Sequence, residues 1–149
     1  MKILQLIDTL SLGGAERMSV NIANVLAENG IESYLVASRK GGPLQQFLLP
    51  NVKYYSLDKK NGLDIKGFYR LIRLVKQIKP DIIHAHSTSV YWAIGLKLFV
   101  RKSKVTWHDH YGLSDTLKNN DRFWLKLFSK WLDGVIVVNA VLEICAKKI

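Results

Sequence analysis

The sequence predicts an α/β fold in which a parallel, doubly wound sheet lies between two layers of helices. Short runs rich in β-branched residues alternate with longer stretches whose apolar residues recur with the period of a helix. Glycine and proline punctuate these stretches. Parallel strands need crossover connections, and right-handed crossovers place helices on both faces of the sheet. A chain of 149 residues is long enough for one such domain.

Six strands are expected, over residues 2–8, 32–38, 52–57, 81–86, 104–108 and 134–139, and the first is expected to be buried. Between them, helices are expected over residues 15–29, 65–79, 91–100 and 122–132, and residues 141–149 resemble the start of another. The pattern predicts a Rossmann-like domain of three layers with strand order 3-2-1-4-5-6.

Apolar stripes predict which faces of the first two helices pack on the sheet. In the first helix the expected core residues are Met18, Ile22, Val25 and Leu26. In the second they are Phe68, Ile72, Val75 and Ile78, and Pro80 ends that helix.

Composition excludes several classes of protein. Hydrophobic residues make up 48% of the chain and charged residues 23%, which excludes a disordered chain. The single cysteine, Cys145, excludes an internal disulfide and a zinc ribbon and favours a cytoplasmic location. The apolar runs are too short for a membrane anchor. The net charge of +10 favours an anionic partner, such as nucleic acid, a lipid surface or a phosphorylated substrate.

Gly13 and Gly14 stand between the first strand and the first helix, where free backbone N–H groups favour a phosphate or carboxylate. A tight turn that binds nothing is an equal alternative at this stage. The dinucleotide-binding glycine pattern is incomplete and Walker A is absent, so a nicotinamide cofactor is not expected.

All four histidines form two His-x-His pairs, each at the carboxyl end of an expected central strand: His84 with His86, and His108 with His110. Residues two apart point to one face of a strand, so each pair can converge. A metal site that includes Asp109 is one interpretation. The favoured one makes His84 a hydrogen-bonded core residue, and lets His108 and His110 meet a ligand.

Five basic residues form a further pattern around the second helix. Lys66, Arg70 and Arg73 share one face of it, and Lys59 and Lys60 precede it. A solvated surface is the ordinary interpretation and an anionic membrane the functional one. No nucleic-acid-binding motif is visible, so nucleic acid is not expected as a partner.

The motifs D-T-L-S-L-G-G-A-E-R, K-P-D-I-I-H-A-H-S, V-T-W-H-D-H and G-V-I-V-V-N occur in this order. The chain resembles over essentially its whole length the N-terminal domain of retaining GT-B glycosyltransferases of the family 4 type. That family builds capsular, lipopolysaccharide and phosphoinositol glycans. Asn139 is a small departure, since family members often carry serine there.

The resemblance implies a site at the switch point of the sheet. Gly14 would present its N–H to the donor diphosphate, Gly13 would shape the turn, and His108 would be the catalytic histidine that contacts the donor sugar. His86, Ser87, Asp109 and His110 are expected to line the same crevice because they follow neighbouring strands. The resemblance also implies that no metal or cofactor is needed, and that the departing phosphate accepts the acceptor's proton.

The expected function is therefore sugar transfer, with retention, from a nucleotide-sugar donor to a glycan or lipid-linked acceptor in cell-surface polysaccharide synthesis. Residues 1–149 would form the acceptor-side domain, and the donor-binding domain is expected outside this chain. The expected location is the cytoplasm, with peripheral contact at the inner face of the plasma membrane through the five basic residues. Two alternatives remain: a binding module for an anionic ligand without turnover, and a metal-dependent hydrolase that uses the histidine pairs.

Overall fold

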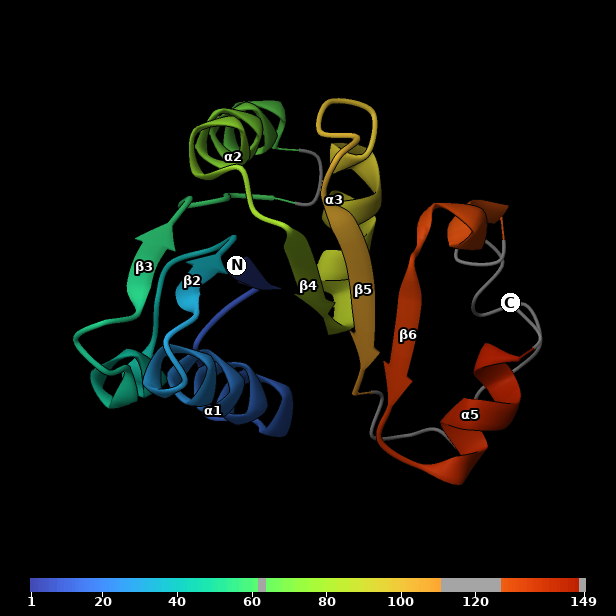
Figure 1. Cartoon of the computed structure of the whole chain (residues 1–149), viewed down its shortest axis with the longest axis horizontal. Coiled ribbons are helices and arrows are strands. Elements are labelled where there is room, and N and C mark those ends of the chain that lie inside the picture. Colours follow the sequence, from blue (N-terminus) through green and yellow to red (C-terminus); the bar gives the residue numbers. More distant parts are fainter. Residues whose placement is uncertain (62–63, 111–126, 148–149) are drawn as a thin grey trace.

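The computed structural model describes residues 1–61, 64–110 and 127–147 as a parallel sheet with helices on both faces (Figure 1). The order of the strands is β3-β2-β1-β4-β5-β6, and every neighbouring pair is parallel. This confirms the predicted fold class and strand order. The strands are β1 (Lys2–Ile7), β2 (Glu32–Ala37), β3 (Lys53–Ser56), β4 (Ile82–His86), β5 (Lys104–Asp109) and β6 (Gly134–Val137).

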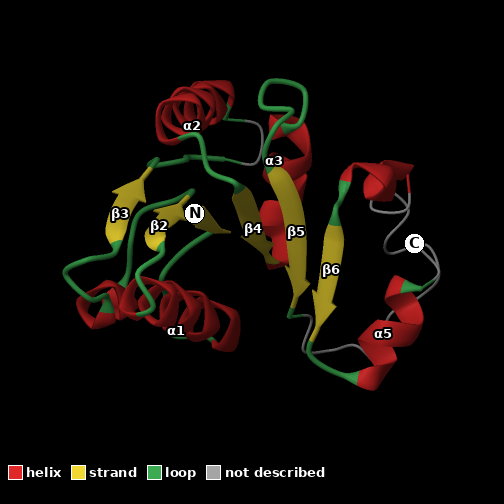
Figure 2. Ribbon diagram, viewed as in Figure 1, coloured by secondary structure: helices red, strands yellow, loops and turns green. Residues whose placement is uncertain are grey.

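Helices cover the sheet from two sides (Figure 2). The α-helices are α1 (Gly14–Glu28), α2 (Ile65–Ile78), α3 (Val90–Leu96) and α5 (Ala140–Ala146). Short 3-10 helices are η1 (Pro43–Phe47), η2 (Ser87–Ser89) and η4 (Ser129–Trp131). Helix α1 lies on one face of the sheet, and α2 and α3 lie on the other (Figure 1).

Each face of the sheet has its own apolar core. The core under α2 and α3 includes the predicted Ile72, Val75 and Ile78, with Phe68 packed at its margin. For α1 the prediction was wrong for Met18 and Val25, whereas Ile22 and Leu26 are partly buried and the fully buried residues are Ser19, Val20 and Ala23. Met18 and Val25 are among the exposed large hydrophobic residues. Ser19, Val20 and Ala23 are small, so the helix can pack closely on the sheet through the face that they form. Close packing therefore selects this face over the one with the larger apolar side chains.

The helix expected over 91–100 ends at Leu96. Tighter bonds of the i→i+3 type follow it, from Leu98 N to Gly95 O and from Phe99 N to Leu96 O, because the chain turns back there toward β5. Most of the helix expected over 122–132 lies outside the described residues. No helix in the described part of the chain combines the length and apolar character that a membrane crossing requires.

The register of the central strands gathers polar side chains on one face. Gln5 pairs with His84 across β1 and β4, and His86 pairs with His108 across β4 and β5. Gln5 is two residues from Ile7, which belongs to the core under α1. Since side chains alternate along a strand, Gln5 and the three histidines lie on the α1 side of the sheet.

Candidate functional site

The predicted site residues follow the carboxyl ends of three adjacent strands. Strand β1 leads to Gly13 and Gly14, β4 ends at His86 before Ser87, and β5 ends at Asp109 before His110. Because β1, β4 and β5 are neighbours and parallel, these residues share one edge of the sheet. The first helix of the chain starts at this edge.

The N-terminus of α1 has no side-chain cap. Gly13 precedes the helix with extended backbone, and the first intrahelical bond runs from Arg17 N to Gly13 O. A methyl group added at Gly14 would meet no other atom of the described residues within 4 Å. The Glu16 carboxylate lies beside Gly13, where it accepts a hydrogen bond of 3.3 Å from the Thr9 hydroxyl. The turn therefore offers open space and free N–H groups, with one carboxylate at its side.

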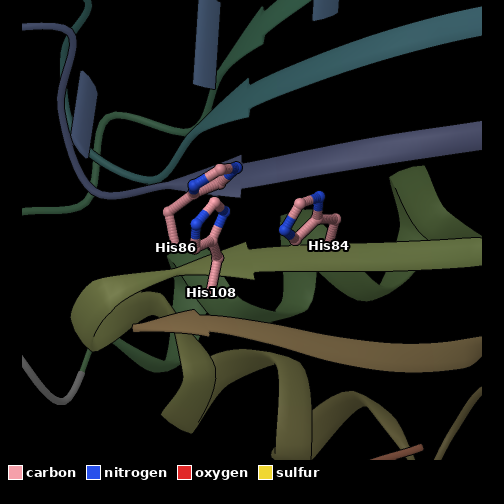
Figure 3. Close-up of side chains that lie close together, drawn as sticks. All are labelled: His84, His86 and His108. Atoms are coloured by element: carbon pink, nitrogen blue, oxygen red, sulfur yellow. The ribbon is translucent and has the colours of Figure 1, made fainter. Parts of the chain in front are cut away.

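The four histidines form a single cluster (Figure 3 shows three of them). The His84 ring stacks on His86 at 4.6 Å between centroids and on His108 at 5.3 Å. The rings of His108 and His110 are 3.9 Å apart. His84, His86 and His108 are buried, and His110 is partly exposed. The two His-x-His pairs thus converge, as their spacing predicts.

A hydrogen-bonded chain fixes the tautomer of His86. Its Nε2 lies 2.7 Å from Gln5 Oε1, and its Nδ1 lies 3.0 Å from His110 Nε2. The amide oxygen of Gln5 only accepts, so His86 Nε2–H donates to it. Neutral His86 then accepts at Nδ1 from His110 Nε2–H, which leaves His110 Nδ1 as an acceptor. Gln5 thereby orients two of the four rings.

Burial keeps the imidazoles neutral. It lowers the pKa of His84 to about 4, and the charges of His108 and His110 add to this. Burial, followed by the other three rings, lowers the pKa of His86 to about 2. Burial and His110 lower the pKa of His108 to about 4, against an opposing contribution from Asp109. At neutral pH each of the three rings can both donate and accept a hydrogen bond.

Two buried histidine nitrogens have no hydrogen-bond partner among the described residues: His84 Nε2 and His108 Nδ1. His84 is buried, as expected of a core residue, but its Nε2 has no hydrogen-bond partner among the described residues, and its ring stacks on two other imidazoles. A free nitrogen on His108 at this edge is available to a ligand.

Ser87 and Asp109 complete the edge. Ser87 has a left-handed backbone with φ of 49°, and its carbonyl accepts a hydrogen bond of 3.0 Å from Trp107 Nε1. Such a conformation is unfavourable for serine, so the surrounding contacts impose it at the end of β4. Asp109 is buried at the end of β5.

The structure adds a polar group that the sequence did not single out. Asp8, directly after β1, accepts hydrogen bonds from Ser38 Oγ, from Arg39 Nε at 2.8 Å and from Lys59 Nζ at 3.0 Å. Burial raises the pKa of Asp8, but these three hydrogen bonds outweigh it and lower the pKa overall. Lys59 also lies 4.8 Å from the centre of the Trp92 ring.

This contact corrects part of the predicted basic face. The side chain of Lys59 is only 12% exposed and turns toward Asp8, because an ion pair and an aromatic ring are available there. It cannot also face a membrane. The other four basic residues are exposed, although the Arg70 guanidinium donates to Leu57 O. They are Lys60, Lys66, Arg70 and Arg73.

Solved structures show which proteins share this fold. A lipopolysaccharide outer core galactosyltransferase, WaaB, matches all of this chain with 43% of its own, at a TM-score of 0.70 and 18% identity. A glycosyltransferase from Rickettsia africae aligns 38% of its length with 96% of this chain, with a TM-score of 0.68 and 17% sequence identity. A UDP-GlcNAc 2-epimerase from Neisseria meningitidis bound to UDP-GlcNAc aligns 47% of its length with 96% of this chain, with a TM-score of 0.53 and 17% sequence identity.

This chain thus spans less than half the length of each of these three proteins. No protein with a curated description is similar enough in sequence to match it. The model of Glycosyltransferase Family 4 matches residues 12–143, which include the glycine turn and all four histidines. On this match, supported by the shared GT-B fold, the chain belongs to Glycosyltransferase Family 4.

Proposed function

We propose that this domain is the acceptor-side half of a retaining glycosyltransferase. It moves a sugar from a nucleotide-sugar donor to a glycan or lipid-linked acceptor in cell-surface polysaccharide synthesis. The observation that carries the proposal is the open N-terminus of α1 at the same sheet edge as neutral His108, whose Nδ1 has no hydrogen-bond partner in the described part of the chain. The N-terminus of α1 suits a diphosphate, and the His108 ring suits a sugar hydroxyl. The epimerase with bound UDP-GlcNAc supports the same class of ligand for this fold.

The N-terminus of α1 would bind the donor diphosphate. The N–H groups of the first turn point out of the helix, and the helix dipole favours negative charge there. Gly14 leaves room for a phosphate oxygen to approach the backbone. The Glu16 carboxylate must turn away from Gly13 when the phosphate arrives, because two anions cannot share the site.

His108 would act on the sugar as a neutral hydrogen-bonding group. Its Nδ1 is buried without a hydrogen-bond partner among residues 1–61, 64–110 and 127–147, and the low pKa of the ring keeps it uncharged at neutral pH. A positioned donor or acceptor in a water-poor site stabilises charge that develops near the transferring carbon. Hydrogen bonds to Gln5 and His110 hold the His86 ring in place, and the His108 ring packs against it.

Retention then needs no side-chain nucleophile. The bond from the anomeric carbon to the diphosphate oxygen breaks, and the acceptor hydroxyl oxygen forms the new bond on the same face. The departing phosphate takes the hydroxyl proton, so charge and atoms balance. The α1 dipole, with basic residues of a donor-binding domain, neutralises the leaving group, and a metal is not required.

Gly14→Ala tests the diphosphate site without disturbing the fold. The added methyl has no neighbour within 4 Å in the part of the chain that the structure describes, and alanine favours a helix, so the melting temperature is expected to stay the same or rise. The KM for the donor is expected to rise roughly tenfold or more, because the methyl occupies the path of the phosphate. Met18→Ala, at an exposed position of α1, is the matched control. Unchanged donor kinetics in Gly14→Ala would remove the glycine turn from the donor site.

We further propose that the enzyme works in the cytoplasm, at the inner face of the plasma membrane, where a lipid-linked acceptor would lie. We expect the exposed Lys60, Lys66, Arg70 and Arg73 to hold it there, each contributing on the order of 1 kcal/mol with anionic lipid. The protein should float with anionic vesicles at low salt and detach at high salt. Lys66→Gln with Arg73→Gln should weaken flotation, whereas the exposed pair Lys102→Gln with Lys104→Gln should not. Equal flotation with neutral vesicles would assign the four cations to an ordinary solvated surface.

A further inference from the structure

A cavity of about 360 Å³ lies at the end of the sheet opposite the candidate functional site. Its walls come from the segment between α3 and β5 and from η4 with the residues that lead into β6. The arrowheads of β5 and β6 point away from both segments (Figure 1). Strand β5 has six residues and spans roughly 16 Å at about 3.3 Å per residue. The cavity is therefore separate from the sheet edge that holds the glycine turn.

Positive charge dominates the wall of this cavity. The charged residues that line it are Lys97, Arg101 and Lys130, against the carboxylate of Asp133. Asp133 Oδ2 lies 2.6 Å from Lys97 Nζ and accepts a hydrogen bond of 2.7 Å from Val105 N, so this carboxylate is already paired. Within residues 1–61, 64–110 and 127–147, neither Arg101 nor Lys130 makes an ion pair. Two cations of the wall are thus available to an anion.

The turn that carries Arg101 is anchored on both sides. Val100 N and Ser103 Oγ donate hydrogen bonds of 2.8 Å and 2.6 Å to backbone carbonyls, and Ser103 is buried. The backbone of Arg101 is therefore held in place before a ligand arrives, which lowers the entropy cost of binding. Lys102 and Lys104 are exposed in the same turn and add to the positive potential that attracts anions.

An indole ring and an apolar side chain complete the wall. Trp131 is partly buried, packs against the core under α2 and α3, and lies 5.6 Å from the Phe128 ring between centroids. Leu98, also in the wall, is 59% exposed. Aromatic side chains next to cations bind ligands that combine a ring with a phosphate, because the ring stacks while the phosphate is paired. The wall therefore suits a ligand with an anionic group and a ring.

Size and charge narrow the class of ligand. Pockets for small ligands measure about 300–1,000 Å³, so this cavity suits a compact molecule. A phosphate monoester carries a charge of about −1.5 to −2 at pH 7, which two cations can balance. The guanidinium of Arg101 offers forked donors that match phosphate oxygens, and Lys130 offers a point charge.

We propose that this cavity binds a small phosphate ester, with the phosphate on Arg101 and Lys130 and the ring of the ester on Trp131. A nucleoside monophosphate and a sugar phosphate share this chemistry. The proposal is independent of sugar transfer, because none of these three residues belongs to the candidate functional site.

NMR titration of residues 1–149 tests the site. UMP, glucose 1-phosphate and inorganic phosphate are added separately at low salt. The chain has four tryptophans, and the indole N–H signal of Trp131 is identified by its loss in Trp131→Phe. That signal should shift saturably with UMP, with glucose 1-phosphate or with both, at a Kd on the order of 0.1–1 mM. Inorganic phosphate should bind several times more weakly, because it has no ring to contact the indole.

Charge variants assign the phosphate to its cations. Arg101→Gln with Lys130→Gln should weaken binding of the ester by roughly tenfold or more, and high salt should weaken binding to the unchanged chain. Lys66→Gln with Arg73→Gln removes the same charge from exposed positions of α2 and should leave the Kd unchanged. Gly14→Ala should also leave it unchanged, because the glycine turn lies at the other end of the sheet.

Three results would contradict the proposal. The first is the absence of any Trp131 shift with either ester up to about 10 mM. The second is a set of shifts confined to the amides of Gly13 and Gly14, which would place the phosphate at the glycine turn. The third is equal affinity for the ester in the unchanged chain and in a folded variant that carries both Arg101→Gln and Lys130→Gln.

Discussion

Replacing His108 by alanine is expected to lower kcat/KM of the complete enzyme by roughly two to four orders of magnitude. A positioned hydrogen-bonding group that acts near the transferring carbon is worth this much when it is lost. His108 is buried at the end of β5, and its Nδ1 has no hydrogen-bond partner among the residues that the structure describes, so the alanine variant would remove the proposed contact with the sugar. The loss should appear mainly in kcat, because the interaction strengthens as charge develops on the sugar.

His110→Ala is the internal comparison for this experiment. His110 is partly exposed and donates to His86, so its loss should reduce kcat/KM less than the loss of His108. Thermal melts of both variants separate catalytic effects from unfolding. Full activity of a folded His108→Ala enzyme would remove this histidine from the catalytic site.

Acid should destabilise the domain well before its carboxylates are protonated. The pKa values of His84 and His108 fall from 6.5 to about 4, and that of His86 falls to about 2. Between pH 6.5 and 4 the unfolded chain therefore binds protons that the native chain does not, and the free energy of unfolding falls as pH falls. At pH 5 each ring that stays neutral in the native state lowers the free energy of unfolding by about 2 kcal/mol relative to its value at neutral pH.

Urea unfolding between pH 7.5 and 5, with a chelator present, measures this effect. Near pH 5 the slope of the unfolding free energy against pH should correspond to an uptake of about three protons on unfolding. His84→Gln should reduce that uptake by one proton. Imidazole resonances of the unchanged chain, followed by NMR, should show the same three rings unprotonated at pH 5. A stability that does not change between pH 7.5 and 5 would show that the rings titrate normally.

The fold could be read from the sequence because the four central strands, β1, β2, β4 and β5, are buried on both faces. Such strands appear in the sequence as short apolar runs. Because helical stretches alternate with these runs, the sequence predicts a parallel, doubly wound sheet. The packing face of α1 could not be read in this way. Val20 and Ala23 contribute little to an apolar stripe, yet they are buried while Met18 and Val25 are exposed. How closely a helix approaches the sheet is a tertiary property.

The histidines of the site could also be predicted, because a spacing of two residues fixes a common face of a strand. Gln5 could not, since a single glutamine in an apolar strand shows no pattern until the register sets it opposite His84. The position of Lys59 likewise depends on Asp8 and Trp92, which lie far from it in the sequence. Charge patterning alone placed it on the surface with its neighbours.

Nucleotide release from UDP- and GDP-sugars is the most direct test of the two-domain account. Residues 1–149 carry only one wall of the proposed cleft, so they should fold but release no nucleotide, and should bind the donor only at about millimolar Kd or more weakly. The protein that carries this domain with a donor-binding domain should release nucleotide as it transfers sugar. Turnover by residues 1–149 alone, or none by the two-domain protein with any donor, would contradict the account.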